Sequence, residues 1–451
     1  MGGSASVSDR WVELFPRDIL IPVPNGVKIM QALRIAPSEC VREDAEPDEA
    51  WEDLVVGAVA DFPRSEYNLT NVRLAGQMIA GDLKWTPESE EVIREAFHIA
   101  NNWREAHAYP MRSVRGSLRW YMNYYDIDGV TVARLKRMQA IRRKLQRTSI
   151  KLHQLQDLGG CRAIVWSIAD VRKLVETMRQ CRHELRAESD YIATPKKDGY
   201  RSHHLMFNYR GRGDRKIFDD KRIEVQIRTR LQHSWATAVE SVGLFLGEYL
   251  KGGIGNPQWL QLFKLMSAEF ARFEGCAEPP DVPPHHQRVS EIIALEKALE
   301  ATKNLDKLSH AVRYTDISVS PLEKPTYYLI IYDNATNEIS VESYFIPKSA
   351  MASYGTAEFF DNKTGRDTKN VVLVEADKVD QLKEAYPNYF GDVQLFRAQL
   401  RNITKGTGVR AYTLKPQESV RPRPGENPDL TWLRRRIRWT ETTAPRKRPS
   451  R

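Results

Sequence analysis

The most constraining feature of the sequence is residues 222–229 (RIEVQIRT), in which apolar and reactive side chains alternate. Side chains of an extended strand point alternately to its two faces, so the three apolar residues share one face. Glu224, Gln226 and Arg228 then share the other. The segment predicts a strand with one buried face and one face that carries a carboxylate, an amide and a guanidinium. An ordinary half-buried strand with a solvated outer face has the same pattern, so this segment alone does not define a site.

Two further segments supply the chemistry that this face needs. Residues 191–204 (YIATPKKDGYRSHH) form a polar loop with a lysine pair, a glycine and aromatic residues. Upstream, residues 156–166 (QDLGGCRAIVW) place Asp157 and Arg162 on either side of a Gly-Gly turn that leads into an apolar strand. In proteins, Mg²⁺ prefers one or two carboxylates together with phosphate oxygens and waters. Asp157 and Glu224 together predict a magnesium site facing a triphosphate, whereas Asp157 alone is better explained as a turn residue than as a ligand.

Basic residues are concentrated just before these segments. Between Arg104 and Lys151 the chain has twelve Lys/Arg and three acidic residues. Residues 130–136 are expected to begin as a short strand, and residues 140–147 have the composition of a helix. A solvated helix face accounts for part of this positive charge. A polyphosphate ligand requires such a positive field beside a carboxylate turn and a lysine-containing loop.

In combination, these segments resemble the RelA/SpoT-type alarmone synthetases, which transfer pyrophosphate from ATP to the 3′-hydroxyl of a guanine nucleotide. The resemblance covers about residues 95–275, and the pieces follow the family's order. It implies an α+β fold with a mixed β-sheet flanked by helices, as in nucleotidyltransferases. It also implies ATP and GDP or GTP as substrates, Mg²⁺ as cofactor, (p)ppGpp as product and a role in the bacterial stringent response. The matching pieces are Arg134 to Lys136, Lys144 with Arg147, Asp157 to Arg162, Asp190 to Lys196, Gly199 to His204, and Glu224 to Thr229.

The resemblance also implies roles for single residues. The residues implied in binding the ATP phosphates and adenine are Arg134, Lys136, Lys144, Arg147 and Arg162. Arg147 is expected to stack on the adenine ring through a cation–π contact.

For the catalytic pair, the resemblance implies that Asp157 and Glu224 hold Mg²⁺. Glu224 is also expected to take the proton from the attacking hydroxyl. The residues implied in binding the acceptor nucleotide are Lys196, Tyr200, His204 and Gln226. Tyr200 is expected to stack on the acceptor base.

The sequence departs from the family pattern at several positions. Ala140 stands where many members have a serine, which affects either a phosphate contact or a helix cap. Glu240 lies one residue beyond the glutamate of small synthetases, so Glu240 and His233 are weaker candidates for reading the base. The chain has no His-Asp dipeptide, on which the hydrolase of bifunctional relatives is built. We therefore expect synthesis without hydrolysis.

Other functions remain open at this point. Some relatives act as toxins that modify the 3′ end of tRNA or adenine nucleotides, and Tyr200 does not discriminate because an aromatic ring stacks on any base. A catalytically silent nucleotide-binding regulator is a third interpretation. A catalytically inactive site has no chemical need for two carboxylates, so the presence of Asp157 and Glu224 argues against a silent regulator.

The flanking regions carry weaker signals. A proline-containing stretch is expected to link the synthetase region to a second, smaller α/β module. For this module the sequence predicts a helix at 288–310, a hairpin at 326–345, a strand at 370–375 and a helix at 378–385. Regulation, homo-oligomerisation and partner docking are all open for this module, and so is the role of a plain structural appendage. The expected divisions are an N-terminal extension 1–87, the synthetase domain 88–277, a linker 278–287, the C-terminal module 288–416 and a basic tail 417–451.

The tail accounts for most of the net charge. Residues 421–451 contain ten Lys/Arg and three acidic residues, or +7 of the formal charge of +9. Trp432 and Trp439 flank an arginine cluster, a combination that binds single-stranded RNA or simply forms a solvated end. The four cysteines, Cys40, Cys161, Cys181 and Cys276, show no paired spacing, and apolar runs such as 327–332 are too short to cross a bilayer. We expect a cytoplasmic protein without a membrane partner.

Overall fold

The computed structural model describes residues 59–246, 248–311, 313–314, 327–333, 338–364, 369–376 and 393–411. The chain divides into two units, Met1–Val409 and Arg410–Arg451, and every helix and strand below belongs to the first. Most of the N-terminal extension, the turn of the predicted hairpin, the helix expected at 378–385 and the basic tail with its tryptophans lie outside the described residues.

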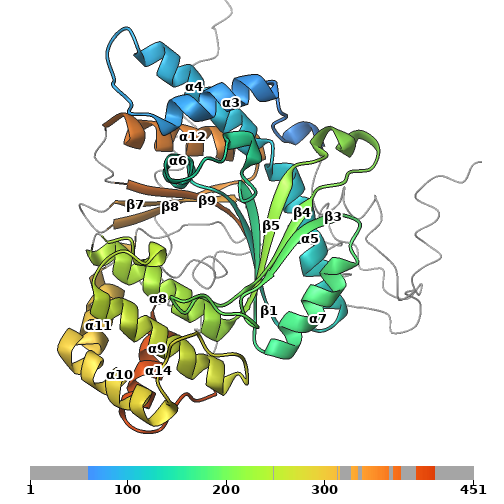
Figure 1. Ribbon diagram of the computed structural model, residues 1–451. Helices are drawn as coiled ribbons and strands as arrows, with labels where there is room; N and C mark the ends of the chain where they lie inside the picture. Colours follow the sequence, from blue (N-terminus) through green and yellow to red (C-terminus); the bar gives the residue numbers. More distant parts are fainter. Residues whose placement is uncertain are drawn as a thin grey trace, which may run out of the picture. The chain divides into compact units, whose positions relative to one another are not determined.

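A mixed β-sheet runs through the first unit (Figure 1). Among the described residues it has nine strands in the order β3-β4-β5-β2-β1-β9-β7-β8-β6. Strands β2 and β5 run parallel, as do β6 and β8, and the other neighbours are antiparallel. The strands are β1 Gly129–Leu135, β2 Gly159–Val165, β3 Glu184–Asp190, β4 His203–Asn208, β5 Arg222–Thr229, β6 Arg313–Tyr314, β7 Tyr327–Asp333, β8 Glu338–Tyr344 and β9 Lys369–Glu375.

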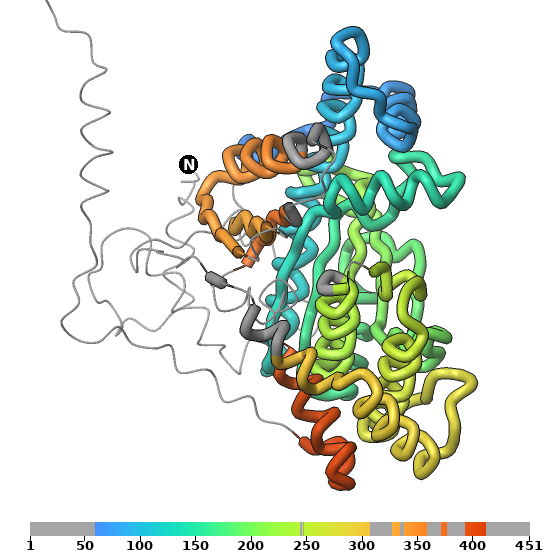
Figure 2. The backbone as a smooth tube through the Cα atoms, turned by 90° about the vertical axis from the view of Figure 1, so that its left-hand side faces the viewer, coloured from blue at the N-terminus to red at the C-terminus, as the bar shows by residue number. Residues whose placement is uncertain are grey.

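Helices flank this sheet, as the α+β prediction requires. Side chains of α5, α7 and α12 form the main core with one face of the sheet. Helices α8, α9, α10, α11 and α14 pack against one another, and Figure 2 shows α14 (red) beside the yellow segment of α10 and α11. The helices are α3 Leu69–Ala80, α4 Glu90–Glu105, α5 Ala108–Tyr124, α6 Met138–Arg147, α7 Ile168–Arg179, α8 Arg230–Leu246, α9 Pro257–Phe273, α10 His285–Leu299, α11 Ala301–Ala311, α12 Pro347–Thr364 and α14 Gln394–Thr404, with short 3₁₀ turns η2 Val59–Asp61, η3 Leu152–Gln154, η4 Gly213–Phe218 and η5 Leu250–Gly252.

The alternation in β5 produces the two faces that the sequence predicts. Ile223, Val225 and Ile227 are fully buried in the core formed with α5 and α7. Glu224 and Gln226 point to the opposite face and are only partly buried. That face carries the candidate site.

The C-terminal region departs from the expectation of a separate α/β module. Its predicted strands form, but they extend the core sheet instead of building a sheet of their own: β9 pairs with β1, with Ala133 opposite Glu375 and Arg134 opposite Val374. An unpaired edge of β1 would leave backbone donors and acceptors without partners, and β9 pairs with this edge at Ala133 and Arg134. Sequence periodicity predicts a strand but does not say which edge it joins.

The proline-containing stretch leads directly into α10, which begins at His285 and packs on α9. None of the described helices has the length and apolar content that crossing a membrane requires. Cys161, Cys181 and Cys276 are free thiols.

Glu375 provides a test of the shared sheet. Its buried carboxylate at the end of β9 accepts a hydrogen bond from Arg115 (3.0 Å) and pairs with Arg112 (3.5 Å), both on α5. Glu375→Gln leaves these arginines without a counter-charge, so we expect the free energy of unfolding to fall by about 3 kcal/mol in urea titrations. Glu338→Gln, at an exposed position of β8, should change it by less than about 0.5 kcal/mol. Equal effects of the two substitutions would contradict a structural role for this pair.

Candidate active site

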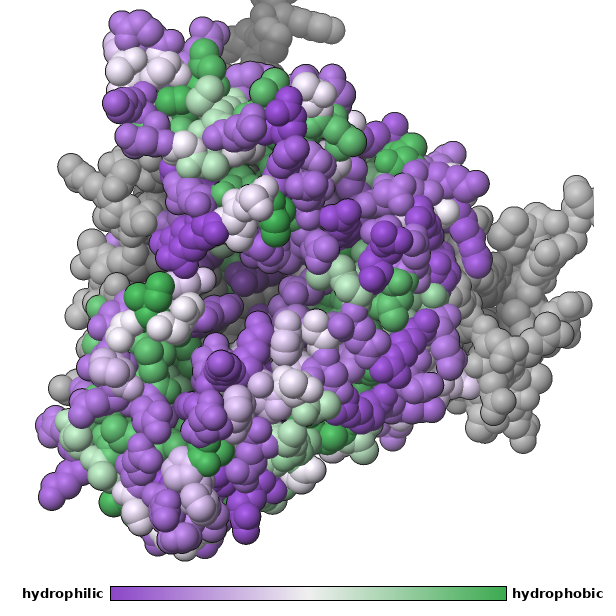
Figure 3. Space-filling model, in the orientation of Figure 1, coloured by the Kyte–Doolittle hydropathy of each residue, from purple (hydrophilic) through white to green (hydrophobic). Residues whose placement is uncertain are grey.

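A cavity of about 280 Å³ opens on the sheet face opposite α5 and α7. Its walls come from β1, β2, β4 and β5, from the loop before β4, and from α8, η5 and α9. Figure 3 shows the hollow with hydrophilic residues at its floor. The predicted site residues that line it are Arg134, Lys136, Asp157, Arg162, Lys196, Tyr200, His204, Glu224 and Gln226.

Two predicted ATP-binding residues, Lys144 and Arg147, do not line this cavity but lie near it on α6. The Nζ of Lys144 is 3.1 Å from Oδ2 of Asp157, so Lys144 contributes to the charge at the cavity edge. The guanidinium of Arg147 lies over the ring of Tyr249, 4.8 Å from its centroid. In the structure, the ring that contacts Arg147 is thus that of Tyr249. Stacking of Arg147 on adenine stays a prediction.

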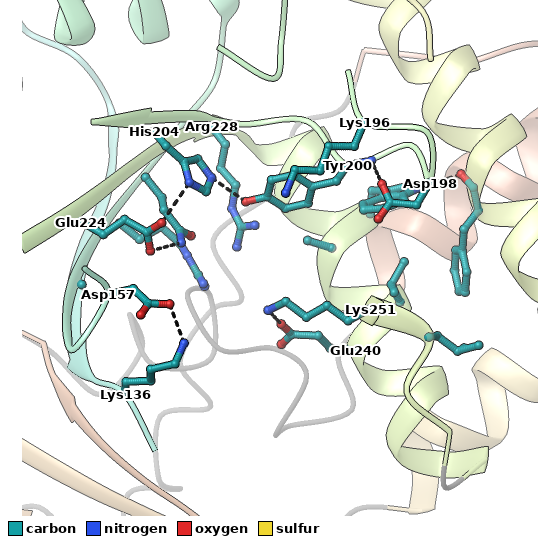
Figure 4. Close-up of a pocket in the computed structure, with 18 of the residues that line it drawn as sticks. Lys136, Asp157, Lys196, Asp198, Tyr200, His204, Glu224, Arg228, Glu240 and Lys251 are labelled. Carbon is teal, nitrogen blue, oxygen red and sulfur yellow. Dashed lines mark hydrogen bonds and ion pairs between the residues drawn. The ribbon is translucent and has the colours of Figure 1, made fainter. Parts of the chain in front are cut away.

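Strand pairing brings the two predicted metal ligands to one place. In the parallel pairing of β2 and β5, Gly160 lies opposite Glu224, and Asp157 lies just before β2. Figure 4 shows Asp157 and Glu224 on the same side of the pocket, each facing its interior. The arrangement places two carboxylates from distant parts of the sequence beside one space.

The carboxylate of Glu224 is held in one position by its neighbours. Nδ1 of His204 lies 3.0 Å from Oε1, and Nε2 of Gln226 donates to Oε2 at 2.8 Å. Because an ionised carboxylate only accepts hydrogen bonds, Nδ1 of His204 carries the proton in this contact. Burial raises the pKa of Glu224, but the hydrogen bond and charge of His204, with smaller contributions from Gln226 and Lys136, outweigh it and lower the pKa to about 2. Glu224 is therefore ionised at neutral pH.

Asp157 is paired with lysines on one oxygen only. Its Oδ2 lies 2.6 Å from Nζ of Lys136 and 3.1 Å from Nζ of Lys144. Its Oδ1 is buried and has no hydrogen-bond partner among the described residues. Such an orphan oxygen is the donor that a hard cation would use. No group of three or more His, Cys, Asp or Glu in the described part of the chain could form a complete metal site. Two carboxylates instead fit Mg²⁺, which completes its shell with phosphate and water.

The opposite wall of the pocket is aromatic. The ring of Tyr200 meets Tyr191, His204 and Trp235 edge to face, with centroids 5.9, 5.7 and 6.3 Å apart. Its hydroxyl lies 2.8 Å from Nε2 of His204, and burial raises the pKa of Tyr200. Lys196 lies over the rings of Tyr191 and Tyr200, 4.4 and 5.2 Å from their centroids. The wall combines stacking surfaces with a cation, as binding a nucleotide base and phosphate requires.

A tight turn sets the position of Lys196 and Tyr200. The amide of Gly199 donates to the carbonyl of Lys196 (2.9 Å), and the amide of Lys196 donates to the carbonyl of Tyr200 (3.2 Å). The side chain of Asp198 accepts from the amide of Tyr200 at 2.9 Å. Gly199 has φ +97°, a conformation that L side chains rarely adopt.

The structure adds pocket residues to those that the sequence identified. Glu240 of α8, which the sequence ranked as a weaker candidate, lines the cavity and lies 2.5 Å from Nζ of Lys251 in η5. Burial raises the pKa of Glu240, but Lys251 and Arg134 oppose it and the net direction is downward. Helical spacing could have found Glu240, since Ala236, Val239 and Glu240 share one face of α8. No sequence pattern points to Lys251.

His233, the other weaker candidate, does not line the cavity. It is buried on α8, and its Nδ1 lies 2.6 Å from the NH2 group of Arg228. Arg228 lines the cavity, so His233 contacts a lining residue but not the cavity itself.

Comparison with known proteins shows which family this part of the chain resembles. A family described as a region found in RelA / SpoT proteins matches residues 133–242, which hold nearly all of the pocket side chains from the sheet and from α8. Residues 133–242 are similar to this family. This match confirms the resemblance seen in the sequence.

Two GTP pyrophosphokinases are similar to parts of this chain. The chain is 31% identical over 140 residues to the GTP pyrophosphokinase YjbM of Bacillus subtilis, covering 29% of this chain and 64% of YjbM. It is 27% identical over 213 residues to a GTP pyrophosphokinase of Haemophilus influenzae, covering 45% of this chain and 26% of that protein. The match thus spans less than two thirds of the length of either relative.

Solved structures of small alarmone synthetases are also similar. The small alarmone synthetase 1 from Bacillus subtilis aligns with a TM-score of 0.33 and 23% identity, over 41% of this chain and 93% of that one. The small alarmone synthetase 2 from the same organism aligns with a TM-score of 0.33 and 21% identity, over 45% and 97%.

The turn at Gly199 can be tested against a matched glycine. A Cβ on Gly199 would lie 3.0 Å from Cβ of Ser267 and 3.2 Å from Cα of Lys264, whereas a Cβ on Gly213 (φ +52°) would meet nothing within 4 Å. We expect Gly199→Ala to lower the free energy of unfolding by about 2–3 kcal/mol. Gly213→Ala should cost about 1 kcal/mol for its positive φ alone. Urea unfolding measures both, and equal losses would show that crowding at Gly199 is unimportant.

Proposed function

We propose that this protein is a nucleotide pyrophosphokinase that transfers pyrophosphate from ATP to the 3′-hydroxyl of GDP or GTP and produces (p)ppGpp. The observation that carries the proposal is the meeting of Asp157 and Glu224 in one pocket lined by cations and by Tyr200. The names of the matched relatives, GTP pyrophosphokinases, support the same reaction class. ATP and GTP are cytoplasmic nucleotides, so we place the activity there.

In this proposal the donor lies over the strand ends of β1 and β2. Arg134, Lys136 and Arg162 line that part of the pocket and would neutralise the ATP phosphates. Asp157 and Glu224 would hold Mg²⁺, which supplies further neutralisation of phosphate charge. Transfer of this kind depends on in-line positioning and on stabilising developing charge, so no nucleophilic serine or cysteine is needed.

The acceptor would bind against the aromatic wall. Tyr200 offers a ring face to the base, and Lys196 and His204 lie beside it. A bond then forms between the 3′-oxygen and the β-phosphorus of ATP, while the bond between that phosphorus and the α–β bridging oxygen breaks and AMP leaves. Glu224 accepts the hydroxyl proton. Its low pKa suits a loose transition state, in which the hydroxyl loses its proton late.

A toxin-type activity on tRNA or adenine nucleotides is the alternative within the same chemistry, because Tyr200 stacks on any base. A silent regulator is disfavoured by the two carboxylates that share the pocket. Hydrolysis is not part of the proposal, since the sequence has no His-Asp dipeptide.

One assay separates these functions. The purified protein is incubated with ATP labelled in its β-phosphate and with GDP, GTP, AMP or deacylated tRNA, with Mg²⁺ and with EDTA. Label that moves only to guanine nucleotides, and only with Mg²⁺, is the expected result. Label in tRNA or AMP supports the toxin-type activity, and no transfer to any acceptor supports the regulator.

Glu224→Gln keeps the shape of the side chain but removes its charge. We expect the transfer rate to fall by at least about 100-fold, because a charge aimed at the reacting groups is lost. Glu188→Gln is a matched control: Glu188 lies on β3 outside the cavity and contacts His203, the neighbour of His204, at 2.7 Å. The control should retain transfer within about twofold. Near-normal turnover of Glu224→Gln would refute the assignment.

The contact between His204 and Glu224 predicts a pH effect. A pKa of about 2 keeps Glu224 ionised above pH 4, so its protonation should not limit the wild-type rate between pH 5 and 8. His204→Leu removes the largest contribution that opposes burial, so the pKa of Glu224 should rise toward its ordinary value of 4.5. The acid limb of the pH–rate profile should therefore move to higher pH. An unchanged acid limb would show that His204 does not control Glu224.

A further inference from the structure

The helix that follows Lys136 has no local cap at its N-terminus. The N-cap position of α6 is Arg137, whose side chain makes no capping hydrogen bond, and the first turn contains no acidic residue. Ala140 in that turn has no side-chain acceptor to offer. The first amide groups of a helix have no partner within the helix, and its N-terminus favours negative charge. This segment needs a partner from elsewhere in the chain.

That partner is Glu358 of α12, 220 residues further along the sequence. Its Oε1 accepts a hydrogen bond from the backbone amide of Met138 at 2.9 Å, where α6 begins. A carboxylate at this position satisfies one of the free amide groups and supplies negative charge to the helix N-terminus. Figure 1 shows α12 (orange) beside α6 and α4.

Arg104 of α4 completes the contact from the other side. Its NH1 group donates to Oε2 of Glu358 at 2.5 Å and to the backbone carbonyl of Lys136 at 3.4 Å. Its guanidinium lies 4.4 Å from the ring centroid of Tyr354, one turn before Glu358 on α12. Arg104 is 0% exposed and Glu358 is 7% exposed. The backbone on both sides of Arg137 is thus fixed by one buried ion pair.

The same C-terminal region also holds the preceding strand. Val374 of β9 is paired with Arg134 of β1, two residues before Lys136. Arg134 and Lys136 both line the cavity, and Lys144 of α6 contacts Asp157 at its edge. Residues 134–138 are therefore fixed by β9 on one side and by α12 on the other.

We propose that the C-terminal region completes the donor half of the pocket, with Glu358 as a positioning residue that acts through the start of α6. This inference rests on the proposed function, because it takes Arg134, Lys136 and α6 as the ATP-binding segment. Glu358 does not touch the nucleotide. It fixes the backbone next to Lys136, which lines the cavity, so its loss should impair binding of the donor and leave binding of the acceptor unchanged.

The first test measures nucleotide affinity by calorimetry with Mg²⁺. The amide of Glu358→Gln has one acceptor oxygen, so it cannot satisfy both the Met138 amide and Arg104. We expect the Kd of α,β-methylene-ATP to rise about five- to tenfold and the Kd of GDP to stay within about twofold. Glu269→Gln is the matched control: Glu269 is 3% exposed and accepts a 2.6 Å hydrogen bond from Arg288, but the pair joins α9 to α10 and does not touch residues 134–138. The control should leave the Kd of the ATP analogue unchanged.

The second test needs no nucleotide. Hydrogen exchange followed by mass spectrometry should show faster exchange in Glu358→Gln within residues 134–147, and unchanged exchange in α9 and α10. Tyr354→Leu, which removes the ring contact with Arg104, should show the same local pattern with a smaller increase.

The outcomes separate the inference from the function on which it rests. A wild-type protein that binds no ATP analogue refutes the proposed function, while the exchange experiment still decides whether Glu358 fixes α6. A wild type that binds the analogue, with Glu358→Gln unchanged or with both nucleotides weakened equally, overturns the inference alone. Faster exchange throughout the unit would also overturn it, because the ion pair would then serve only general stability.

Discussion

The parallel pairing of β2 with β5 is the constraint on which the site depends. Its register sets Gly160 opposite Glu224 and Arg162 opposite Gln226, so the carboxylate just before β2 faces the space that the carboxylate of β5 faces. A shift of one residue would turn Glu224 into the core and expose Ile223 or Val225, which are fully buried. The same apolar alternation that stabilises the sheet thus fixes the chemistry on its other face.

The sequence predicts this part of the molecule well because the signals are local. A period of two residues places Glu224 and Gln226, and the strand predicted after Asp157 places this carboxylate at a strand end, without knowledge of the rest of the chain. The Gly-Gly turn itself was wrong, because Gly159 and Gly160 are the first paired residues of β2. Roles that depend on tertiary contacts leave no such signal. Lys251 lines the pocket because η5 packs on α8. Strand β9 pairs with the edge of β1 that does not face β2. Lys144 and Arg147 were predicted from resemblance, and the structure sets them at the edge of the site.

The C-terminal region shows how far a site can depend on distant sequence. Residues 134–138 carry the predicted phosphate-binding cations, yet the start of α6 has neither a capping side chain nor an acidic first turn. The missing contacts come from Glu358 and from β9. A region that contributes no side chain to the pocket can therefore support the geometry of residues 134–138. Sequence motifs identify Arg134 and Lys136, but they do not identify Glu358 and β9, which contact this segment.

Three carboxylates of the pocket already have a basic or hydrogen-bonding partner before any nucleotide binds. Asp157 pairs with Lys136 and Lys144, Glu240 pairs with Lys251, and the carboxylate of Glu224 lies against His204. A polyphosphate that takes Lys136 and Lys144 as partners must displace Asp157, whose partly buried carboxylate would then have no counter-charge. In the proposed function a magnesium ion that enters with the triphosphate offers Asp157 that replacement. Under the proposed function, this exchange of partners would make binding of the cation and of the phosphates interdependent, because either ligand alone would leave a charge unpaired in a half-buried site.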